Sequence, residues 1–277
     1  HRMILVDLHV HSTCSDGTTR PLDLAKKGAA LGISVMSLAD HDTTEGVADF
    51  LVSCRRCRVA GVSGVELSAE FGSVLHILGY RYDPDHPELK KEFEELRRGR
   101  DVRNREICLR LQKLGHDVSI EEVEAEAHGE VVARPHIARV MVRKGRVPDM
   151  ASAFVRYLAH DAPAYVPRYR LSPERCIGII RKAGGVAVLA HPGQTTGDPD
   201  VLRKILRELK SLGLWGLECM SSRHTPEQVF TYLRIASELA LFPTAGSDYH
   251  GDNRPGVSMG IAVSEDLTPW ARLGVSL

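Results

Sequence analysis

The sequence has no long apolar run and no excess of charge of one sign. Its hydrophobic segments fall short of the roughly 20 residues that a membrane-spanning helix needs, and its start, HRMILVDLH, lacks the features of a secretory signal. Lys plus Arg and Asp plus Glu each number 36, so no global positive field draws the chain to long nucleic acids or anionic membranes. We expect a cytoplasmic protein without membrane contact, and no feature indicates a protein partner.

The six cysteines form no recognisable zinc or redox motif. Only Cys54 and Cys57 have Cys-x-x-Cys spacing, whereas a zinc ribbon needs a second pair and a redox motif needs a thioredoxin-like setting. We expect unpaired thiols in a reducing compartment. Cys14 lies among imidazole and carboxylate groups, whose nitrogen and oxygen donors make its thiol the less favoured metal ligand.

Short apolar segments alternate with longer helical patterns. The helical segments 21–32 and 198–213 place Leu, Ile and Ala at helical spacing and end at glycine. This alternation predicts an α/β fold with parallel strands and crossover helices, and about seven strands suffice to close or nearly close a barrel. The predicted strands are 3–10, 33–40, 60–67, 74–80, 186–192, 214–219 and 242–248.

Residues 87–165 interrupt the alternation. They contain no convincing strand and are rich in charge and helix formers, which predicts a helical insertion or cap over a barrel made of residues 3–86 and 166–277. Residues 97–105, RRGRDVRNR, hold five arginines. They form either a solvated helix face, the commoner role of a charge run, or a rim that faces phosphate.

Metal-binding side chains recur in pairs at both ends of the chain. In DLHVH, His9 and His11 point to the same side of a strand and can reach one ion. Asp7 shares this side and is placed to fix an imidazole. Asp248 and His250 repeat the spacing in SDYH. The two pairs predict one shared site.

Further donors stand at or near the ends of other predicted strands. They are Asp40, His41, Glu66 and His191. His76 lies near the start of its strand, so the end of the barrel that its side chain faces stays open. Each alone is compatible with a structural role. Together they predict a metal site, because catalytic groups of a barrel gather where its strands emerge.

HVHSTCSDG, LADHDTTEG, GVELS, HILGY, AHPG and GSDYH, in this order, resemble the PHP superfamily, named for its polymerase-associated and histidinol phosphatase members. The resemblance implies a distorted (β/α)7 barrel, TIM-like, with two or three metal ions at the C-terminal ends of the strands. RPHIARVMV (134–142) and YVPRY (165–169) resemble the subgroup that removes phosphate from nucleoside monophosphates and nucleoside 3′,5′-bisphosphates. A close relative of that subgroup degrades short RNA from its 5′ end.

The resemblance also assigns ligands to three ions, with Glu66 bridging the first two. In order, the ligand groups are His9, His11, Glu66 and Asp248; Glu66, His76 and His191; and Asp16, His41 and His250. Some family members have histidine at the position of Asp16. The third site of this chain is therefore harder in character, and we expect it to bind less tightly or to prefer manganese.

The donor types agree with this assignment. Imidazole and carboxylate without thiolate suit Mn²⁺, which we expect first, with Fe²⁺ or Zn²⁺ as alternatives. Two or three such ions fit hydrolysis of a phosphate ester, in which a hydroxide that bridges two ions attacks in line.

Candidates for the remaining roles are fewer. Arg134 and His136 are the first choices for contacting substrate. A guanidinium presents a planar fork of donors to phosphate, and the resemblance places this segment over the pocket. The alternative is that Arg134 caps its own helix. Arg100 and Arg103 are weaker candidates from the charge run.

Two further residues have predicted catalytic roles. His224 follows the sixth strand and is either the acid that protonates the departing oxygen or a surface histidine. Asp40 is expected to orient a metal-binding histidine rather than to bind metal.

The leading prediction is a metal-dependent phosphatase that acts on a nucleoside 5′-monophosphate or 3′,5′-bisphosphate. The alternatives are a 5′-to-3′ exoribonuclease on short RNA, which the balanced net charge mildly disfavours, and histidinol phosphatase. A non-enzymatic alternative is a degenerate, metal-stabilised binding module. Degeneration predicts missing ligands, and every ligand position is filled.

Overall fold

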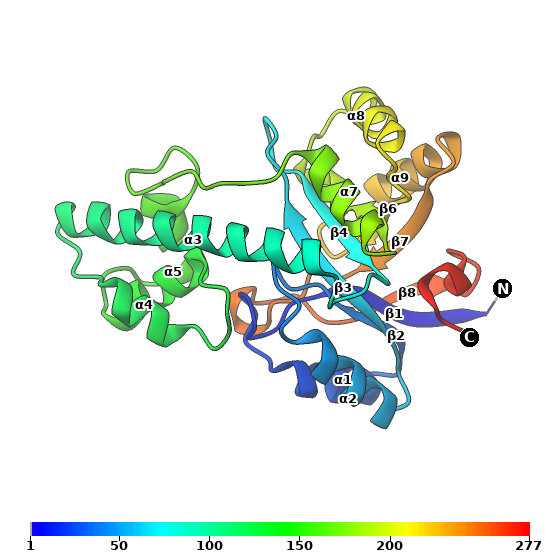
Figure 1. The fold of residues 1–277 in the computed structure, drawn as a ribbon, viewed down its shortest axis with the longest axis horizontal. Helices are drawn as coiled ribbons and strands as arrows, with labels where there is room; N and C mark the ends of the chain where they lie inside the picture. Colours follow the sequence, from blue (N-terminus) through cyan, green and yellow to red (C-terminus); the bar gives the residue numbers. More distant parts are fainter. Residues whose placement is uncertain (1) are drawn as a thin grey trace.

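Eight strands form a curved sheet in the computed structural model, which describes residues 2–277 (Figure 1). Along the sheet the order is β7-β6-β5-β4-β3-β2-β1-β8. The strands are β1 Met3–Val10, β2 Ile33–Leu38, β3 Ala60–Ser68, β4 His76–Tyr80, β5 Val186–Leu189, β6 Gly216–Ser221, β7 Phe242–Gly246 and β8 Ile261–Ser264. After β7 the chain returns to β1, where the Asp248 amide donates to the His9 carbonyl at 2.8 Å. The predicted, nearly closed α/β barrel is confirmed.

Strand β4 runs against its neighbours. It pairs antiparallel with β3, with Ser68 opposite His76, and antiparallel with β5, whereas β1–β2–β3 and β5–β6–β7 are parallel. The prediction of an all-parallel barrel is therefore wrong for this strand. As a consequence, the start of β4 lies at the same end of the barrel as the C-terminal ends of the parallel strands. That end is the mouth of the barrel.

The eighth strand, β8, was not among the predicted strands. It has four residues and pairs antiparallel with the first half of β1. A segment this short gives too few residues for a periodic apolar signal.

Helices α1 and α2 cover one side of the barrel, and α7, α8 and α9 cover the other (Figure 1). Ser172, Asp198 and Thr225 cap the last three through their side-chain oxygens, and proline follows each cap. The buried stripe of Leu202 and Leu206 shows how α8 presents its apolar face to the barrel. These helices are α1 Pro21–Ala30, α2 Val47–Arg56, α7 Pro173–Lys182, α8 Pro199–Ser211 and α9 Pro226–Glu238.

The described residues between 87 and 165 are helical or irregular and contain no strand, as predicted. The elements are α3 Pro87–Lys113, α4 Ile120–Glu126, α5 Arg134–Arg143, α6 Met150–Ala153 and a π-helical turn, Phe154–Leu158. Leu89 and Phe93 of α3 pack into the barrel's outer core, while Ile107 and Leu111 join a separate core with α4 and α5. We therefore keep the predicted division into barrel and insertion as a proposal, with α3 shared between the two cores. Among the described helices, none combines the length and apolarity needed to cross a membrane.

Candidate metal centre

Nine imidazole and carboxylate side chains meet at the mouth of the barrel. They form three overlapping groups, and within each group the donor atoms lie within 4.8 Å of one another. The groups are His9, His11, Glu66 and Asp248; Glu66, His76 and His191; and His11, Asp16, His41 and His250. The structure thus brings together all nine side chains that the sequence analysis selected as ligands. It adds His11 to the third group.

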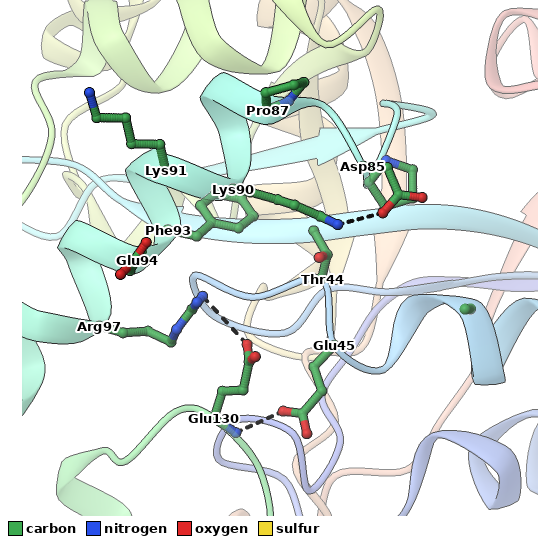
Figure 2. A pocket seen from close by; sticks show the side chains of 12 residues that line it. Thr44, Glu45, Asp85, Pro87, Lys90, Lys91, Phe93, Glu94, Arg97 and Glu130 are labelled. Carbon is green, nitrogen blue, oxygen red and sulfur yellow. Dashed lines mark hydrogen bonds and ion pairs between the residues drawn. The ribbon is translucent and has the colours of Figure 1, made fainter.

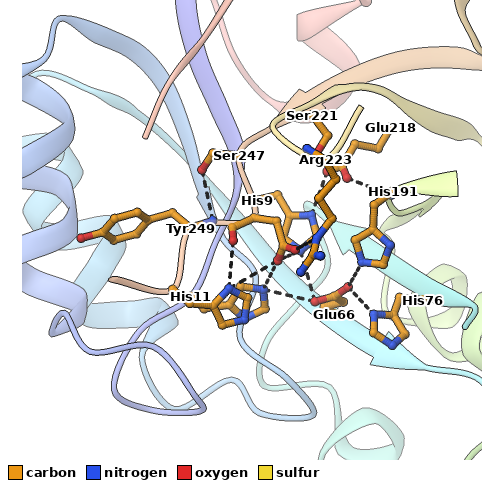
Figure 3. Close-up of polar contacts among 12 residues, drawn as sticks. His9, His11, Glu66, His76, His191, Glu218, Ser221, Arg223, Ser247 and Tyr249 are labelled. Atoms are coloured by element: carbon orange, nitrogen blue, oxygen red, sulfur yellow. Dashed lines mark hydrogen bonds and ion pairs between the residues drawn. The ribbon is translucent and has the colours of Figure 1, made fainter. Parts of the chain in front are cut away.

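Glu66, at the end of β3, occupies the middle of the cluster (Figure 3). Its Oε1 lies 2.7 Å from Nδ1 of His76 and 3.0 Å from Nε2 of His191. Its Oε2 lies 3.1 Å from Nε2 of His9 and 3.2 Å from Nε2 of His11. One carboxylate therefore faces two groups of imidazoles with different oxygens, which is the geometry that a bridging ligand requires.

The strand directions explain how these side chains converge. His76 begins β4, and because β4 is antiparallel this position lies at the mouth of the barrel. His191 and Asp248 follow β5 and β7 with φ of 24° and 58°, a backbone region that non-glycine residues rarely adopt. Such conformations persist only where the surroundings hold them, and they cluster at functional sites.

Glu218 on β6 is a functional residue that sequence reasoning missed. Its fully buried carboxylate accepts a hydrogen bond from the ring Nδ1 of His9 at 2.8 Å and another from the backbone N–H of His191 at 2.9 Å. It therefore fixes members of two metal-binding groups at once. The available signal was an isolated glutamate inside the apolar strand GLECMS, where a buried charge needs a partner.

Asp7 does not fix an imidazole, contrary to the prediction. Its oxygens accept backbone N–H groups from Ser247 at 2.9 Å, Gly260 at 2.8 Å and His9 at 3.2 Å. It ties the loops around β8 and the end of β7 to β1. The buried N–H groups of those loops would otherwise lack partners.

Asp40 also holds backbone and hydroxyl groups rather than a ring. It accepts hydrogen bonds from the Ser12 amide at 2.7 Å, the Ser12 hydroxyl at 2.5 Å and the Ser15 hydroxyl at 2.6 Å. Among the described residues, no histidine ring is hydrogen-bonded to it. The predicted orienting contact to a histidine is thus wrong, and Asp40 instead fixes the loop that carries Asp16.

The side chains at the mouth fit divalent cations. Both ring nitrogens of His11 are buried and form no hydrogen bond, and the same holds for Nδ1 of His41. Buried nitrogens without partners are costly, and a bound cation would satisfy them. Burial, with Asp40 nearby, raises the pKa of the Cys14 thiol to about 12, so that residue stays protonated and leaves the nitrogen and oxygen donors as ligands.

The surroundings of His9 and His11 favour the protonated form of their rings. Burial alone would lower the pKa of His11, but the carboxylates of Asp248 and Glu66, 3.3 and 3.2 Å from its Nε2, raise it to about 10. Burial likewise opposes protonation of His9, yet Glu218 and Glu66 raise its pKa well above the usual value. A cation that binds these two rings therefore competes with protons.

We expect Mn²⁺ binding at pH 7 to release protons and to weaken as the pH falls, because the raised pKa values favour protonated rings. Calorimetric titrations in two buffers of different ionisation enthalpy measure the released protons. Equal heats in both buffers would contradict this reading.

Six arginines share a cavity of about 230 Å³ with the metal-binding side chains. They come from α3, α5, the segment after the insertion and the loop after β6, so that the insertion forms one wall. The six residues, which we call the arginine wall, are Arg100, Arg103, Arg134, Arg168, Arg170 and Arg223. Arg100, Arg103 and Arg134 were predicted; the other three were not.

Buried Asp42 holds two of these arginines. Its Oδ2 accepts hydrogen bonds from Arg100 Nε at 2.9 Å and Nη2 at 2.6 Å, and it lies 3.5 Å from Nη1 of Arg168. Burial and the neighbouring Arg100 together lower the pKa of Arg168 to about 9. The wall is therefore crowded with positive charge that an anion would stabilise.

Arg134 is held without a carboxylate. It donates to the Leu158 carbonyl at 2.8 Å, and its guanidinium lies 5.7 Å from the ring centroids of both Phe154 and Tyr165. These contacts hold the side chain in the cavity wall and leave further N–H donors for a ligand. They do not show the alternative role of capping its own helix.

His136 and His224 do not line the arginine cavity. His136 Nδ1 accepts the Ala133 amide at 2.9 Å, so this ring caps the start of α5. His224 Nδ1 donates to the Cys219 carbonyl at 2.9 Å, and burial lowers its pKa. A neutral ring held in this way is poorly placed to protonate a leaving group.

An α/β barrel whose mouth gathers imidazoles and carboxylates beside a wall of arginines defines a metal-dependent hydrolase of phosphate esters. The family model of the PHP domain matches residues 7–144. The chain is 32% identical over 272 residues to the 3′,5′-nucleoside bisphosphate phosphatase of Chromobacterium violaceum, covering 98% of this chain and 95% of that protein. It is also 34% identical over 245 residues to a 5′-3′ exoribonuclease of Haemophilus influenzae, covering 88% and 89%.

Solved structures agree with this match. A Chromobacterium violaceum amidohydrolase with bound sulfate and no metal superposes with a TM-score of 0.89 at 31% identity, covering 97% of this chain and 95% of that one. A protein from Bifidobacterium adolescentis, described as a metal-dependent phosphoesterase, superposes with a TM-score of 0.85 at 29% identity, covering 97% and 93%. The chain belongs to the PHP domain family and is a metal-dependent phosphoesterase.

Proposed function

We propose that the protein removes a phosphate from a small nucleotide, with a nucleoside 3′,5′-bisphosphate as the preferred substrate and a nucleoside 5′-monophosphate as a second one. The observation that carries the proposal is the arginine wall that shares one cavity with the metal-binding cluster. The name of the relative from Chromobacterium violaceum and the sulfate bound to the amidohydrolase from that organism support it.

The balance of charge in the wall favours two phosphates over one. Asp42 pairs with Arg100 and Arg168, and Arg223 pairs with Asp248. The other three arginines of the cavity, Arg103, Arg134 and Arg170, form no ion pair with any carboxylate among the described residues. Guanidinium groups bind phosphate through parallel N–H donors, and Arg170 has a buried Nε without a partner.

The roles of the chain's residues follow from this arrangement. We assign the nine side chains at the mouth to two or three divalent ions, which supply the charge that activates water and neutralises phosphoryl oxygens. Manganese is our first choice. The arginines orient the ester so that its phosphorus faces the cluster, and the insertion limits access of bulk water. The small cavity suits the phosphates and sugar of a mononucleotide.

The experiment compares phosphate release from adenosine 3′,5′-bisphosphate, AMP, histidinol phosphate and a 5′-phosphorylated short RNA, with Mn²⁺ present. We expect the bisphosphate to have the highest kcat/KM. Arg170→Ala should lower that value by about 10- to 100-fold and change hydrolysis of AMP much less, because a charge-assisted contact contributes about 1.5–3 kcal/mol.

The matched control is Arg105→Ala. Arg105 is an exposed arginine of α3 that pairs with Glu124 and does not line the cavity. It should behave as wild type with every substrate. Turnover of histidinol phosphate alone would overturn the proposal.

An exoribonuclease acting on short RNA is the second candidate, because the relative from Haemophilus influenzae carries that name. Its substrate also presents a terminal phosphate to the cavity. A higher kcat/KM for shortening the RNA than for hydrolysing the bisphosphate would establish this alternative. A degenerate binding module predicts no turnover at all, and the convergence of all nine donors speaks against it. Cytoplasmic location stays a prediction.

A further inference from the structure

The three metal-binding groups differ in what surrounds them. The two groups that share Glu66 are built from side chains at or just past the strand ends of the barrel. The third group contains Asp16, on the loop between β1 and α1, and His250, which precedes the short helical turn Gly251–Asn253. This third group lies where the insertion meets the barrel.

One side chain links the two loop ligands of the third group to the insertion. Asn253 Nδ2 donates to the backbone carbonyl of Asp16 at 2.6 Å, and Asn253 Oδ1 accepts a hydrogen bond from Arg139 Nε, on α5, at 2.6 Å. Asn253 also ends the turn that begins after His250. The path from α5 to Asp16 therefore consists of two short hydrogen bonds through one amide.

The insertion also touches the ligand-bearing loops directly. A Cβ on Gly129 would lie 2.4 Å from the Cα of Cys14, so only glycine permits this approach between the insertion and the loop of Asp16. The backbone amide of Glu130 donates to Glu45 at 2.7 Å (Figure 2). The Glu130 carboxylate accepts the Thr43 hydroxyl at 2.9 Å, two residues after His41 of the third group. These contacts of Asn253, Gly129 and Glu130 fall on the loops that carry ligands of the third group.

We propose that Arg139 and Asn253 are positioning residues that set the affinity of the third group for its divalent cation, so that docking of the insertion controls this ion and not the other two. Arg139 does not line the arginine cavity. It faces a separate cavity of about 190 Å³ together with Asn253 and His136. Arg139 acts on Asp16 through Asn253, and residues that hold a metal ligand in this way tune its metal binding.

The test measures Mn²⁺ bound to Arg139→Ala and Asn253→Ala by equilibrium dialysis with metal analysis, without any phosphate ester present. We expect the weakest-bound ion to lose affinity about 10-fold or more while the tighter ions are retained, as is typical for loss of an outer partner of a metal ligand. Arg139→Gln keeps an N–H donor and should recover part of the affinity. The double variant should be no weaker than either single one, because both residues belong to one path.

Arg105→Ala is the control, since Arg105 is an exposed arginine of the insertion that pairs with Glu124, whereas Glu126 is the ion-pair partner of Arg139. It should bind metal as wild type. Melting of the metal-free proteins identifies any variant that does not fold, and Arg139→Gln carries the test if Arg139→Ala fails. Wild-type binding by Arg139→Ala, equal weakening of all ions, or a wild-type protein without a third ion would overturn the proposal. None of these outcomes depends on which substrate is hydrolysed.

Discussion

Glu66→Gln is expected to abolish most phosphoesterase activity, with kcat falling about 10³-fold or more, since a metal centre supplies several kcal/mol of transition-state stabilisation. Each oxygen of Glu66 faces a different set of imidazoles, His76 and His191 on one side and His9 and His11 on the other. An amide replaces one acceptor by an N–H donor, so whichever way it turns, one group loses its carboxylate ligand. Metal analysis should find fewer ions in the variant, and turnover of a generic phosphate monoester gives the activity.

Glu70→Gln is the matched control for this substitution. Glu70 lies just past the end of β3, is exposed and belongs to none of the metal-binding groups, so its replacement should leave metal content and kcat unchanged. Circular dichroism of both variants separates a lost ligand from a lost fold. Full metal content and wild-type turnover in Glu66→Gln would remove the central assumption of the site.

The sequence predicts that several of the clustered side chains meet, because strand geometry is local. Alternation along a strand places His9 and His11 on one side, and strand ends of a barrel meet at one mouth, so these features need no knowledge of distant packing. The direction of His76 could not be predicted in this way. It depends on β4 running antiparallel to β3, and the pairing of two strands is a tertiary property.

The partners of the ligands were harder to predict than the ligands. Asp7 and Asp40 lie beside histidines in the sequence, yet both bind backbone or hydroxyl groups, because buried N–H groups of nearby loops also require acceptors. The carboxylate that does fix His9 is Glu218, 209 residues away along the chain. Arg168, Arg170 and Arg223 were likewise missed, since the wall assembles from four separate segments.

Glu218→Gln is expected to weaken metal binding by about 10- to 100-fold while the fold is kept, as is typical when the outer partner of a ligating histidine is lost. Two N–H groups donate hydrogen bonds to the Glu218 carboxylate, the ring Nδ1–H of His9 and the backbone N–H of His191. The backbone N–H cannot change, so the glutamine must direct its oxygen there and its NH₂ group toward the ring.

The ring of His9 then has to accept at Nδ1, which places its proton on Nε2, the nitrogen that faces Glu66 and Asp248. A protonated Nε2 has no lone pair for a cation, so the variant loses a ligand without losing any ligand residue. Equilibrium dialysis with Mn²⁺ measures the effect, and Glu208→Gln on the exposed face of α8 serves as control. Wild-type affinity in Glu218→Gln would show that the tautomer of His9 is not set by this carboxylate.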